Sequence, residues 1–549
     1  MLLSNLDLLA TAPCGVARLR ELILTLAVRG KLVPQDRTDE AASVLLLKIR
    51  EEKDRLIAEG KIKRDEPLAG IVEECNLFAL PHSWKWTNLA TIGVINPRNE
   101  AQDETIASFV QMSAIPVAFS ISHSVDSRPW REIKSGFTHF AEGDVGVAKI
   151  TPCFENGKST VFKNLNNGIG AGTTELHIVR PLGGISPRYV LLFLKTPAFI
   201  SNGEAVMTGS AGQKRMPRYY FESAPFPLPP LAEQSRIVTR VEELMRLCDE
   251  LEARGQLEAK QHAQLVGTLL GSLTASTTLQ ELAEHWQQIA QHFDLLMDRP
   301  QAIDVLEQNL LQLAVRGLLV PQDPQDEPAS TLLQRIRTEK DQLVAEGKIK
   351  RDKPLLPIAD GEKPFELPEG WEWVRFGNAS INRDGERIPV SSSDRENRAK
   401  IYDYYGASGV IDKIDGFLFD KTLLLIGEDG ANLINRSTPV AFLAHGKYWV
   451  NNHAHVIDTT HPELMTYLAL FINAISLEPY VTGTAQPKMN QAKLNSIVIA
   501  LPPLAEQSRI LSRVTALRHL CTELRQRLAA GQTTQSLLAQ SLVESCNAL

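Results

Sequence analysis

Cysteine is scarce in this sequence, and its spacing ties no two positions together. Six cysteines are scattered over 549 residues, and none of them forms a Cys-x-x-Cys pair. This spacing argues against a zinc site and against a disulfide framework, and it suits a reducing compartment. No apolar run approaches the ~20 residues of a membrane-spanning helix, and the N-terminus lacks the basic segment of a secretory signal. We therefore expect a cytoplasmic protein.

Positive charge is also in short supply. Asp and Glu outnumber Lys and Arg by 65 to 58, which leaves a formal net charge of −7. A free-standing nucleic-acid binder is usually basic, so any role on DNA would need local patches or a basic partner. The apolar share of 43% and the charged share of 22% are those of a globular protein. The length suggests about three to four domains.

Motifs for catalysis and cofactor binding are missing as well. There is no phosphate-binding loop of the form G-x-x-x-x-G-K-[ST] and no H-E-x-x-H metal motif. Gly168-x-Gly170-x-Gly172 leads into an expected strand, whereas a dinucleotide loop leads into a helix. Asn96-Pro97-Arg98 differs from the motif with which an amino-methyltransferase holds its target base. We predict no catalytic residue and no cofactor site in this chain.

Two pairs of titratable residues have a structural reading that is simpler than a chemical one. His453 and His455 alternate along an expected strand, and no third metal ligand accompanies them. Hydrogen-bonded or partly buried histidines are the better interpretation. Glu428-Asp429 precedes Gly430 directly after a strand, where two carboxylates more simply shape a turn. No metal site is predicted.

What the sequence does contain is a nine-residue stretch that occurs twice. Pro229-Pro-Leu-Ala-Glu-Gln-Ser-Arg-Ile237 returns unchanged as Pro502 to Ile510, 273 positions later. Each copy opens a helix pattern with two prolines before it and a glutamate in its first turn, where the helix dipole favours negative charge. Apolar residues then recur at the steps of a coiled-coil seam: Ile237, Val241, Leu244, Cys248 and Leu251, and Ile510, Val514, Leu517, Cys521 and Leu524.

One copy alone could be an ordinary amphipathic surface helix. Because both copies carry the same seam, cysteine included, we predict that the two helices pair with each other. The first helix should run to about Gly271, with a possible break at Gly255, and the second to about Asn547, with a possible break at Gly531. Either helix would then be up to ~60 Å long. The polar stretch 274–278 should link the two halves of the chain.

A second repeat precedes the first. Leu26-Ala-Val-Arg-Gly30 and Leu32-Val-Pro-Gln-Asp36 recur 287 positions later, as does Ala58 to Asp65, and Trp84-x-Trp86 returns as Trp371-x-Trp373. Between Trp86 and Pro229 the offset drops by 14 residues and the two sequences diverge. The chain is therefore a tandem duplication in which a scaffold was kept twice and the inserts changed.

The kept framework is helical and the inserts are mixed. Helices are expected over 16–28, ended by Gly30, and from an N-cap at Ser43 to Glu59, with Gly317, Ser330 and Gly347 in the second copy. The first insert should form strands at 145–150, 159–162 and 175–179 and a helix at 188–195. The second should form strands at 422–426 and 453–457 and a helix at 462–475.

The predicted fold is thus α+β, with two α+β insert domains separated and joined by long, paired, coiled-coil helices. Six segments follow. They are a helical framework at 1–80, an insert domain at 81–228, a spacer helix and linker at 229–286, a second framework at 287–365, a second insert domain at 366–501 and a second spacer helix at 502–549.

Recognition chemistry remains as the function of the inserts. The loops 208–216 and 482–490 join small residues to amide and basic side chains, and such side chains suit adenine, guanine or phosphate. A solvated polar loop is the alternative reading. Neither insert is strongly basic, with 14 basic against 11 acidic side chains in the first and 12 against 16 in the second. The candidate DNA contacts are Lys158, Gln213, Lys214, Arg215, Gln486, Lys488 and Asn490.

With these repeats, the chain resembles the specificity subunit of type I restriction–modification systems over essentially its whole length. Inside the inserts, the stretches from Ala148 to Lys158, from Thr173 to Leu176 and from Val450 to His455 support the resemblance. It implies that each insert reads one half of a bipartite double-stranded DNA target and that the long helices set the spacer. The framework would dock two modification subunits that use S-adenosylmethionine to methylate adenine. Restriction subunits would add ATP- and Mg²⁺-dependent cleavage.

Under this reading the chain itself is not an enzyme, and its two different inserts predict an asymmetric target. Two other classes stay open. A chain that fuses specificity with its own methyltransferase or nuclease activity is disfavoured by the missing cofactor and base-holding motifs. A helical scaffold that only organises protein partners would leave the insert domains without a role in DNA preference.

Overall fold

The structure is a computed structural model that describes residues 6–62, 78–119, 123–210, 212–349, 351, 353–483 and 486–548. Parts of the repeat 58–65 and its copy, Cys75, and the loop residues Ala211, Thr484 and Ala485 lie outside the described residues. The chain forms two compact units. The first comprises Met1–Glu258 and Gln532–Leu549, and the second comprises Ala259–Gly531. Among the described residues, no helix is long and apolar enough to cross a membrane.

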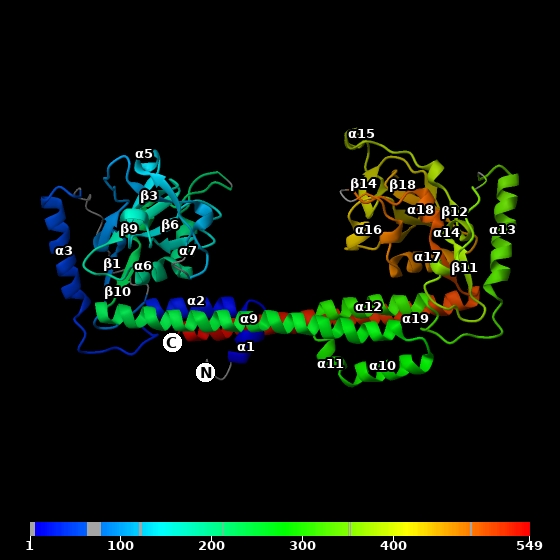
Figure 1. The fold of residues 1–549 in the computed structure, drawn as a ribbon, viewed down its shortest axis with the longest axis horizontal. Coiled ribbons are helices and arrows are strands. Elements are labelled where there is room, and N and C mark those ends of the chain that lie inside the picture. The colour runs from blue at the N-terminus through cyan, green and yellow to red at the C-terminus, as the bar shows by residue number, and fades with distance from the viewer. Residues whose placement is uncertain are drawn as a thin grey trace. The chain divides into compact units, whose positions relative to one another are not determined.

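In the first unit, the insert folds into two four-stranded sheets, which are drawn mainly in light blue to cyan in Figure 1. One sheet has the order β2-β9-β6-β7, with bounds Gly93–Ile95, Leu176–Pro181, Val145–Ala148 and Ser159–Val161. The other has the order β4-β3-β8-β5, with bounds Asp126–Pro129, Ile106–Val110, Ile169–Gly172 and Thr138–Ala141. Three short helices follow, α6 (Pro187–Leu194), α7 (Pro197–Ala205) and α8 (Arg218–Ser223).

The insert of the second unit repeats this topology strand for strand. The order β12-β19-β16-β17 has bounds Ile381–Asn382, Ala454–Asp458, Leu423–Gly427 and Ala441–Ala444. The order β14-β13-β18-β15 has bounds Gly409–Ile414, Tyr402–Gly406, Lys447–Val450 and Phe419–Asp420. The helices α17 (Pro462–Ala474) and α18 (Gln491–Ser496) complete the domain. The predicted α+β class is confirmed, and most of the expected strands lie within one or two residues of the observed ones.

Each insert is closed by a two-stranded sheet made from its first and last residues. In the first unit β1 (Lys85–Asn88) pairs antiparallel with β10 (Pro225–Leu228), and in the second β11 (Glu372–Arg375) pairs with β20 (Val498–Leu501). The strand β10 ends three residues before the spacer helix begins. Both ends of the insert therefore emerge at the framework, which leaves the rest of the insert free to vary.

The framework helices are α2 (Gly15–Val28) and α3 (Ala42–Ala58) in the first unit and α12 (Pro300–Val315) and α13 (Ala329–Ala345) in the second. Gly30 and Gly317 follow α2 and α12 with φ of 68° and 75°, as predicted for residues that end a helix. A Cβ there would lie 2.4–2.5 Å from the ring of Pro81 or Pro368, so a larger residue would also clash.

The predicted N-caps at Ser43 and Ser330 are wrong. The helix α3 begins at Ala42 and α13 at Ala329, so both serines lie inside the first turn. The first N–H groups are satisfied by the chain that leads into the insert instead. Ala42 N donates to the carbonyl of Ser83, and Ala329 N donates to that of Gly370, at 2.9 Å each. A carbonyl that is distant in sequence therefore takes the place of a local capping side chain.

The two spacer helices are longer and more regular than predicted. The helix α9 spans Leu231–Ala275 and α19 spans Leu504–Ala548, and each is continuous through its glycine, Gly255 or Gly531. A helical glycine costs only about 1 kcal/mol relative to alanine, and strong helix formers surround both. After α9, Thr278 caps a further helix, α10 (Leu279–Gln291), through a hydrogen bond from Glu281 N, and α11 (Phe293–Leu296) follows.

The apolar seams pack differently from the prediction. Ile237, Val241 and Cys248 belong to the core of the first unit, together with residues of α2. Ile510 and Val514 belong to the core of the second unit with α12, and Cys521 lies in another cluster there. The expectation that the two seams meet each other is therefore wrong, because an a/d pattern demands an apolar partner without specifying which one.

The ends of the spacer helices make the remaining contacts. In the second unit, Val266, Leu270 and Leu273 of α9 share a core with α12 and with Cys521 of α19. In the first unit, Ala539 and Val543 of α19 pack against Leu9 of α1 (Leu6–Thr11) and Leu22 of α2. Each unit is thus built around one framework helix, the start of one spacer helix and the end of the other.

The repeated nine-residue stretch forms a buried polar cluster at the start of each spacer helix. The carboxylate of Glu233 is fully buried, and it accepts hydrogen bonds from Trp84 Nε1, at 2.9 Å, and from Gln35 Nε2. Glu506 accepts the same bonds from Trp371, at 2.9 Å, and from Gln322. Burial raises the pKa of both carboxyl groups, and these donors oppose the rise. We call this arrangement the Glu–Trp–Gln cluster.

The rest of the stretch secures the same joint. Arg236 pairs with Asp39 at 2.5 Å, and Arg509 pairs with Asp326 at 2.6 Å. Gln234 Nε2 donates to the carbonyl of Pro229 at 3.0 Å, and Gln507 repeats this bond with Pro502 at 2.9 Å. The stretch thereby holds the loop after the first framework helix, the entry into the insert and the first turn of the spacer helix together.

Replacing Trp84 by Phe should destabilise the first unit by about 1–3 kcal/mol, because a buried carboxylate then loses a hydrogen-bond donor. Trp371→Phe should have the same effect in the second unit. Urea unfolding of the full chain measures the change. Since Phe also removes volume, the control is the same substitution in a Glu233→Gln background, where the cost should shrink. Equal costs in both backgrounds would show that the hydrogen bond contributes nothing.

Candidate nucleic-acid interface

The loop that precedes α8 and the loop that precedes α18 are built alike. In the first domain Thr208 and Arg215 exchange two backbone hydrogen bonds, of 3.1 and 2.8 Å, and in the second Thr482 and Lys488 do the same at 2.9 and 2.8 Å. Gly209 and Gly483 lie at φ of 130° and 86°, and a Cβ on either would come within 2.7 Å of a backbone oxygen across the loop. Each loop is therefore a closed hairpin.

Three of the candidate contacts project from these hairpins without an internal partner. Among the described residues, the exposed side chains of Gln213, Lys214 and Gln486 form no side-chain hydrogen bond or ion pair. Exposed amide and ammonium groups can reach a base edge or a phosphate. Their role as DNA contacts stays a prediction.

The cations at the base of each hairpin are paired with carboxylates. Arg215 forms a bidentate ion pair with Glu175, with N–O distances of 2.9 Å, and Arg215 lowers the pKa of Glu175. Lys488 lies 3.3 Å from Glu428. Both cations remain about half exposed, at 46% and 52% of the side chain. A DNA phosphate at either position would have to compete with the carboxylate.

The last two candidates are engaged inside the domains. Lys158 Nζ donates to the carbonyl of Met112 at 2.9 Å, and Lys158 is only half-exposed. The side chain of Asn490 caps α18 by accepting from Lys493 N at 3.0 Å. The residue types that suit DNA also serve turns and caps, which is why the sequence could not separate the two uses.

A buried histidine occupies the same place in each domain. His177 and His455 are the second residues of β9 and β19, opposite Val147 and Ile426 of the neighbouring strand. Each ring faces the carbonyl of a methionine, with Nε2 at 3.2 Å from Met216 O and at 2.8 Å from Met489 O. The equivalent histidines differ on the opposite side of the ring.

In the second domain that side is closed by an ion-pair network. His455 Nδ1 lies 2.6 Å from Asp384, and Arg387 pairs with Glu428 at 2.9 Å. Although burial acts to raise the pKa of Asp384, its bond to His455 and the charge of Arg387 lower it. His453 pairs with Asp429 at 2.7 Å. The prediction that these histidines are hydrogen-bonded is confirmed by these contacts.

In the first domain His177 is part of the lining of a cavity of about 430 Å³. His177 Nδ1 is buried and has no hydrogen-bond partner among the described residues. The lining carries three cations and no carboxylate: Arg98, Lys149 and Arg218, together with His139 and His177. Burial first, and then the charges of Lys149 and Arg218, lower the pKa of His177 to about 4. We call this space the cationic cavity.

The acidic groups around the cationic cavity are already paired. Glu175 is held by Arg215, and Glu222 pairs with Arg218. Lys149 has no hydrogen bond or ion pair of its side chain among the described residues. The cavity therefore offers at least one unneutralised ammonium group to an anion, although the chain as a whole is acidic. Sequence reasoning missed it, since Arg98 lies in the loop after β2, Lys149 directly follows β6 and Arg218 begins α8, far apart along the chain.

Two further sequence features were candidates for metal or nucleotide binding. In the described part of the chain, no three His, Cys, Asp or Glu side chains are grouped so that they could hold a metal ion. The Gly168-x-Gly170-x-Gly172 motif serves packing. A Cβ on Gly170 would lie 2.4 Å from the ring of Phe140, and one on Gly172 would lie 2.7 Å from the carbonyl of Val110.

Comparison with known proteins identifies the family that this chain resembles. A family model for the type I restriction modification DNA specificity domain matches residues 368–530. The specificity subunits of the type I restriction enzymes EcoAI and EcoEI from Escherichia coli are 43% and 44% identical to this chain. Each match covers 97% of this chain and 94% of the relative.

Solved structures with a similar fold are more distant in sequence. A chain from work on complex assembly and conformational transition of the type I R-M system is 16% identical, with a TM-score of 0.49. The match covers 86% of this chain and 99% of the solved chain. The HsdS subunit from Thermoanaerobacter tengcongensis is 18% identical, with a TM-score of 0.41 and coverage of 86% and 98%.

Protonation of His177 should destabilise the first unit in acid. Its pKa falls from an ordinary 6.5 to about 4 on folding, so the unfolded chain takes up this proton first. Stability is retained above about pH 6.5 and is lost as the pH falls towards 4, by roughly 3 kcal/mol. The difference between the pH profiles of the wild type and His177→Asn isolates this effect, because all other groups are shared. Parallel profiles would refute it.

Proposed function

The chain belongs to the specificity subunits of type I restriction–modification systems, and from that premise we propose that its two insert domains each read one half of an asymmetric, bipartite DNA target. The chain is a non-catalytic subunit. The observation that carries the proposal is the pair of domains with one topology and two different surfaces. The first domain has an open cationic cavity, whereas the second has an ion-pair network at the same place.

The spacing between the half-sites would be set by the spacer helices. The helix α9 is a single rod of 45 residues, about 68 Å long at 1.5 Å per residue. Half-sites on one face of B-DNA lie roughly 34 Å apart for each turn, which a helix of this length can span.

The remaining parts of the complex would come from partners. We propose that the two framework copies dock two modification subunits, which bind S-adenosylmethionine and methylate adenine. Restriction subunits with ATP and Mg²⁺ would add cleavage. Support comes from the duplication of the framework, which offers the same helices twice, α2 with α3 and α12 with α13. We place the complex in the cytoplasm, with its DNA substrate.

On DNA, the hairpin side chains and the cationic cavity would act together. Lys214 and Gln213 project from the first hairpin, and Lys149 lies in the cavity, so the first domain offers two unpaired ammonium groups among its described residues. Backbone phosphates are the groups that such cations bind, whereas amides read base edges. Because the chain carries a net charge of −7, tight binding would also need the charges of the partners.

Mapping methylated adenines in cells that contain this chain and its partners tests the proposal directly. We expect one bipartite, non-palindromic site. A chain shortened by seven residues within 257–274 should keep both half-sites and change only the distance between them. A palindromic site would contradict the two-reader proposal, and an unchanged distance would contradict the spacer. The isolated chain with labelled S-adenosylmethionine should transfer no methyl group, and transfer would identify a fused methyltransferase instead.

Lys149→Ala and Lys214→Ala should each weaken DNA binding by the assembled complex and reduce the slope of log affinity against log salt by about one. The physical reason is that each lysine that neutralises a phosphate releases one counterion. Fluorescence anisotropy at several salt concentrations measures both quantities. Lys413→Ala, which removes an exposed lysine that is paired with Asp403 at 3.3 Å, is the matched control. An unchanged slope in both variants would exclude these lysines as phosphate contacts.

A further inference from the structure

The two halves of the chain share part of the apolar surface at which framework and spacer helices meet. The seam positions of α9 and α19 carry Ile, Val, Leu, Cys and Leu in the same order. The framework helices α2 and α12 share Leu-Ala-Val at 26–28 and 313–315. Apolar contacts depend on area and shape, so these shared positions do not by themselves decide which spacer helix packs on which framework helix.

In the first unit, an ion pair accompanies the apolar contact. Arg20 of α2 reaches Asp249 of α9 at 2.7 Å and Glu252 of α9 at 2.9 Å. Arg20 is 25% exposed, and the two carboxylates are more open. The framework helix therefore carries the positive charge here, and the spacer helix carries the negative one.

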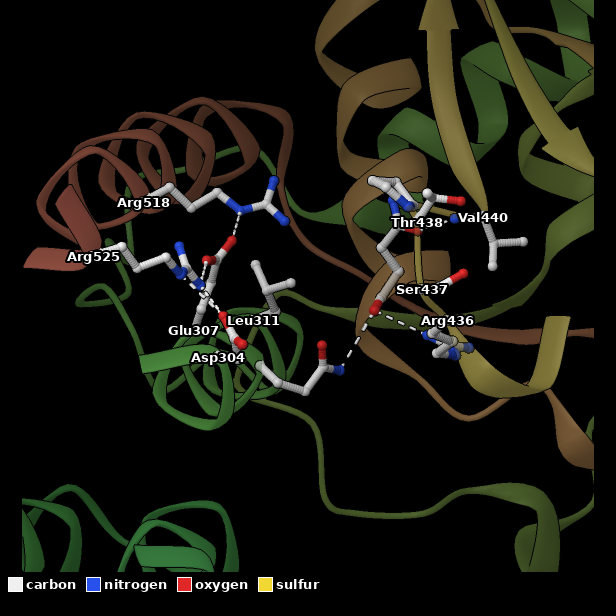
Figure 2. Close-up of a pocket in the computed structure, with 12 residues that line it drawn as sticks. Asp304, Glu307, Leu311, Arg436, Ser437, Thr438, Val440, Arg518 and Arg525 are labelled. Atoms are coloured by element: carbon white, nitrogen blue, oxygen red, sulfur yellow. Dashed lines mark hydrogen bonds and ion pairs between the residues drawn. The ribbon is translucent and has the colours of Figure 1, made fainter. Parts of the chain in front are cut away.

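In the second unit, the signs are reversed. Glu307 of α12 pairs with Arg518 of α19 at 2.9 Å and with Arg525 at 2.7 Å, and Asp304 also pairs with Arg525 at 2.7 Å. Figure 2 shows both arginines reaching from α19 towards these carboxylates, at one side of a cavity of about 520 Å³. Glu307 is 22% exposed.

The reversal affects positions that the duplication makes equivalent. At the framework offset of 287, Arg20 corresponds to Glu307. At the spacer offset of 273, Glu252 corresponds to Arg525. Both members of this pair have therefore exchanged sign, although the five seam positions of the two spacer helices are unchanged.

We infer that the reversed ion pair is a pairing code, which makes each framework helix accept the start of its own spacer helix and reject that of the other. If the start of α19 packed on α2, Arg20 would face Arg525. If the start of α9 packed on α12, Glu307 would face Glu252. The same code rejects the other half of a second copy of the chain. Like charges at a contact suppress wrong partners more strongly than opposite charges reward the right one.

The code has a consequence for what the subunit reads. Exchange of the two spacer helices, within one chain or between two copies, would connect an insert domain to the wrong end of the spacer. The pairing code on the framework helices prevents this exchange without any change to the insert domains. The inference does not depend on which DNA each domain reads, and it survives if the proposed bipartite target is wrong.

The pairing code can be tested with a sign-matched chain, that is, a variant in which both units carry the same charge pattern at this contact. In Arg20→Glu/Asp249→Lys/Glu252→Lys, the first unit keeps an attractive pair but takes the sign pattern of the second. We expect a melting temperature near that of the wild type, whereas Arg20→Glu alone should lower it by about 2–4 °C. The triple variant should lose fidelity when it is unfolded and refolded. A carbodiimide joins amines to carboxylates, so a mispaired chain yields a crosslink between the amine introduced at position 252 and Glu307, which peptide mass spectrometry detects.

This crosslink should rise at least tenfold in the refolded triple variant over the same variant that was never unfolded. The control is Arg20→Lys, which keeps the original sign and should form only the native crosslinks to Asp249 and Glu252. The mirror variant Glu307→Lys/Arg518→Glu/Arg525→Glu repeats the test if the first variant does not refold. Native crosslinks alone in a refolded sign-matched chain would overturn the inference.

Discussion

The joint between insert, framework and spacer depends on one buried carboxylate. Glu233 has no exposed surface, and it is tolerated there because the indole of Trp84 and the amide of Gln35 donate to it. Those donors come from the entry of the insert and from the loop after α2, so the carboxylate fixes three segments at one point. Glu506 repeats the arrangement with Trp371 and Gln322. The nine-residue stretch and the tryptophan are repeated unchanged. A change in either one would leave polar groups of the other without a hydrogen-bond partner.

Beyond that joint, the two insert domains keep a topology and change a surface. Strand order and the buried histidine that contacts a methionine carbonyl are the same in both. What surrounds the ring differs. Asp384 closes one side in the second domain, whereas the first leaves His177 Nδ1 without a partner among the described residues, beside Lys149. A polar surface can differ in this way without a cost to the fold, since the sheets and their cores carry the stability.

The long helices show the opposite division. Their five seam positions are the same, whereas the charges at the contact with the framework differ, since Arg20 in one half corresponds to Glu307 in the other. Surface ion pairs contribute little to stability, roughly 0–1 kcal/mol each. We place their value in discrimination between the two spacer helices, because the seam positions that these helices share leave that choice open.

The sequence by itself determined the duplication, the α+β inserts, the long helices and the family, because these rest on repeats and on local periodicity. It could not determine which surfaces meet. The pattern of the seam with Ile237 and Cys248 predicted that it is buried. Only the structure shows that it packs against α2 and not against the equivalent seam of α19. Likewise Lys158 and Asn490 suited DNA by type, and the structure uses them internally. In contrast, Arg98, Lys149 and Arg218 line one cavity from positions far apart in the chain. Residue type and spacing are local properties, but partners are chosen by three-dimensional packing.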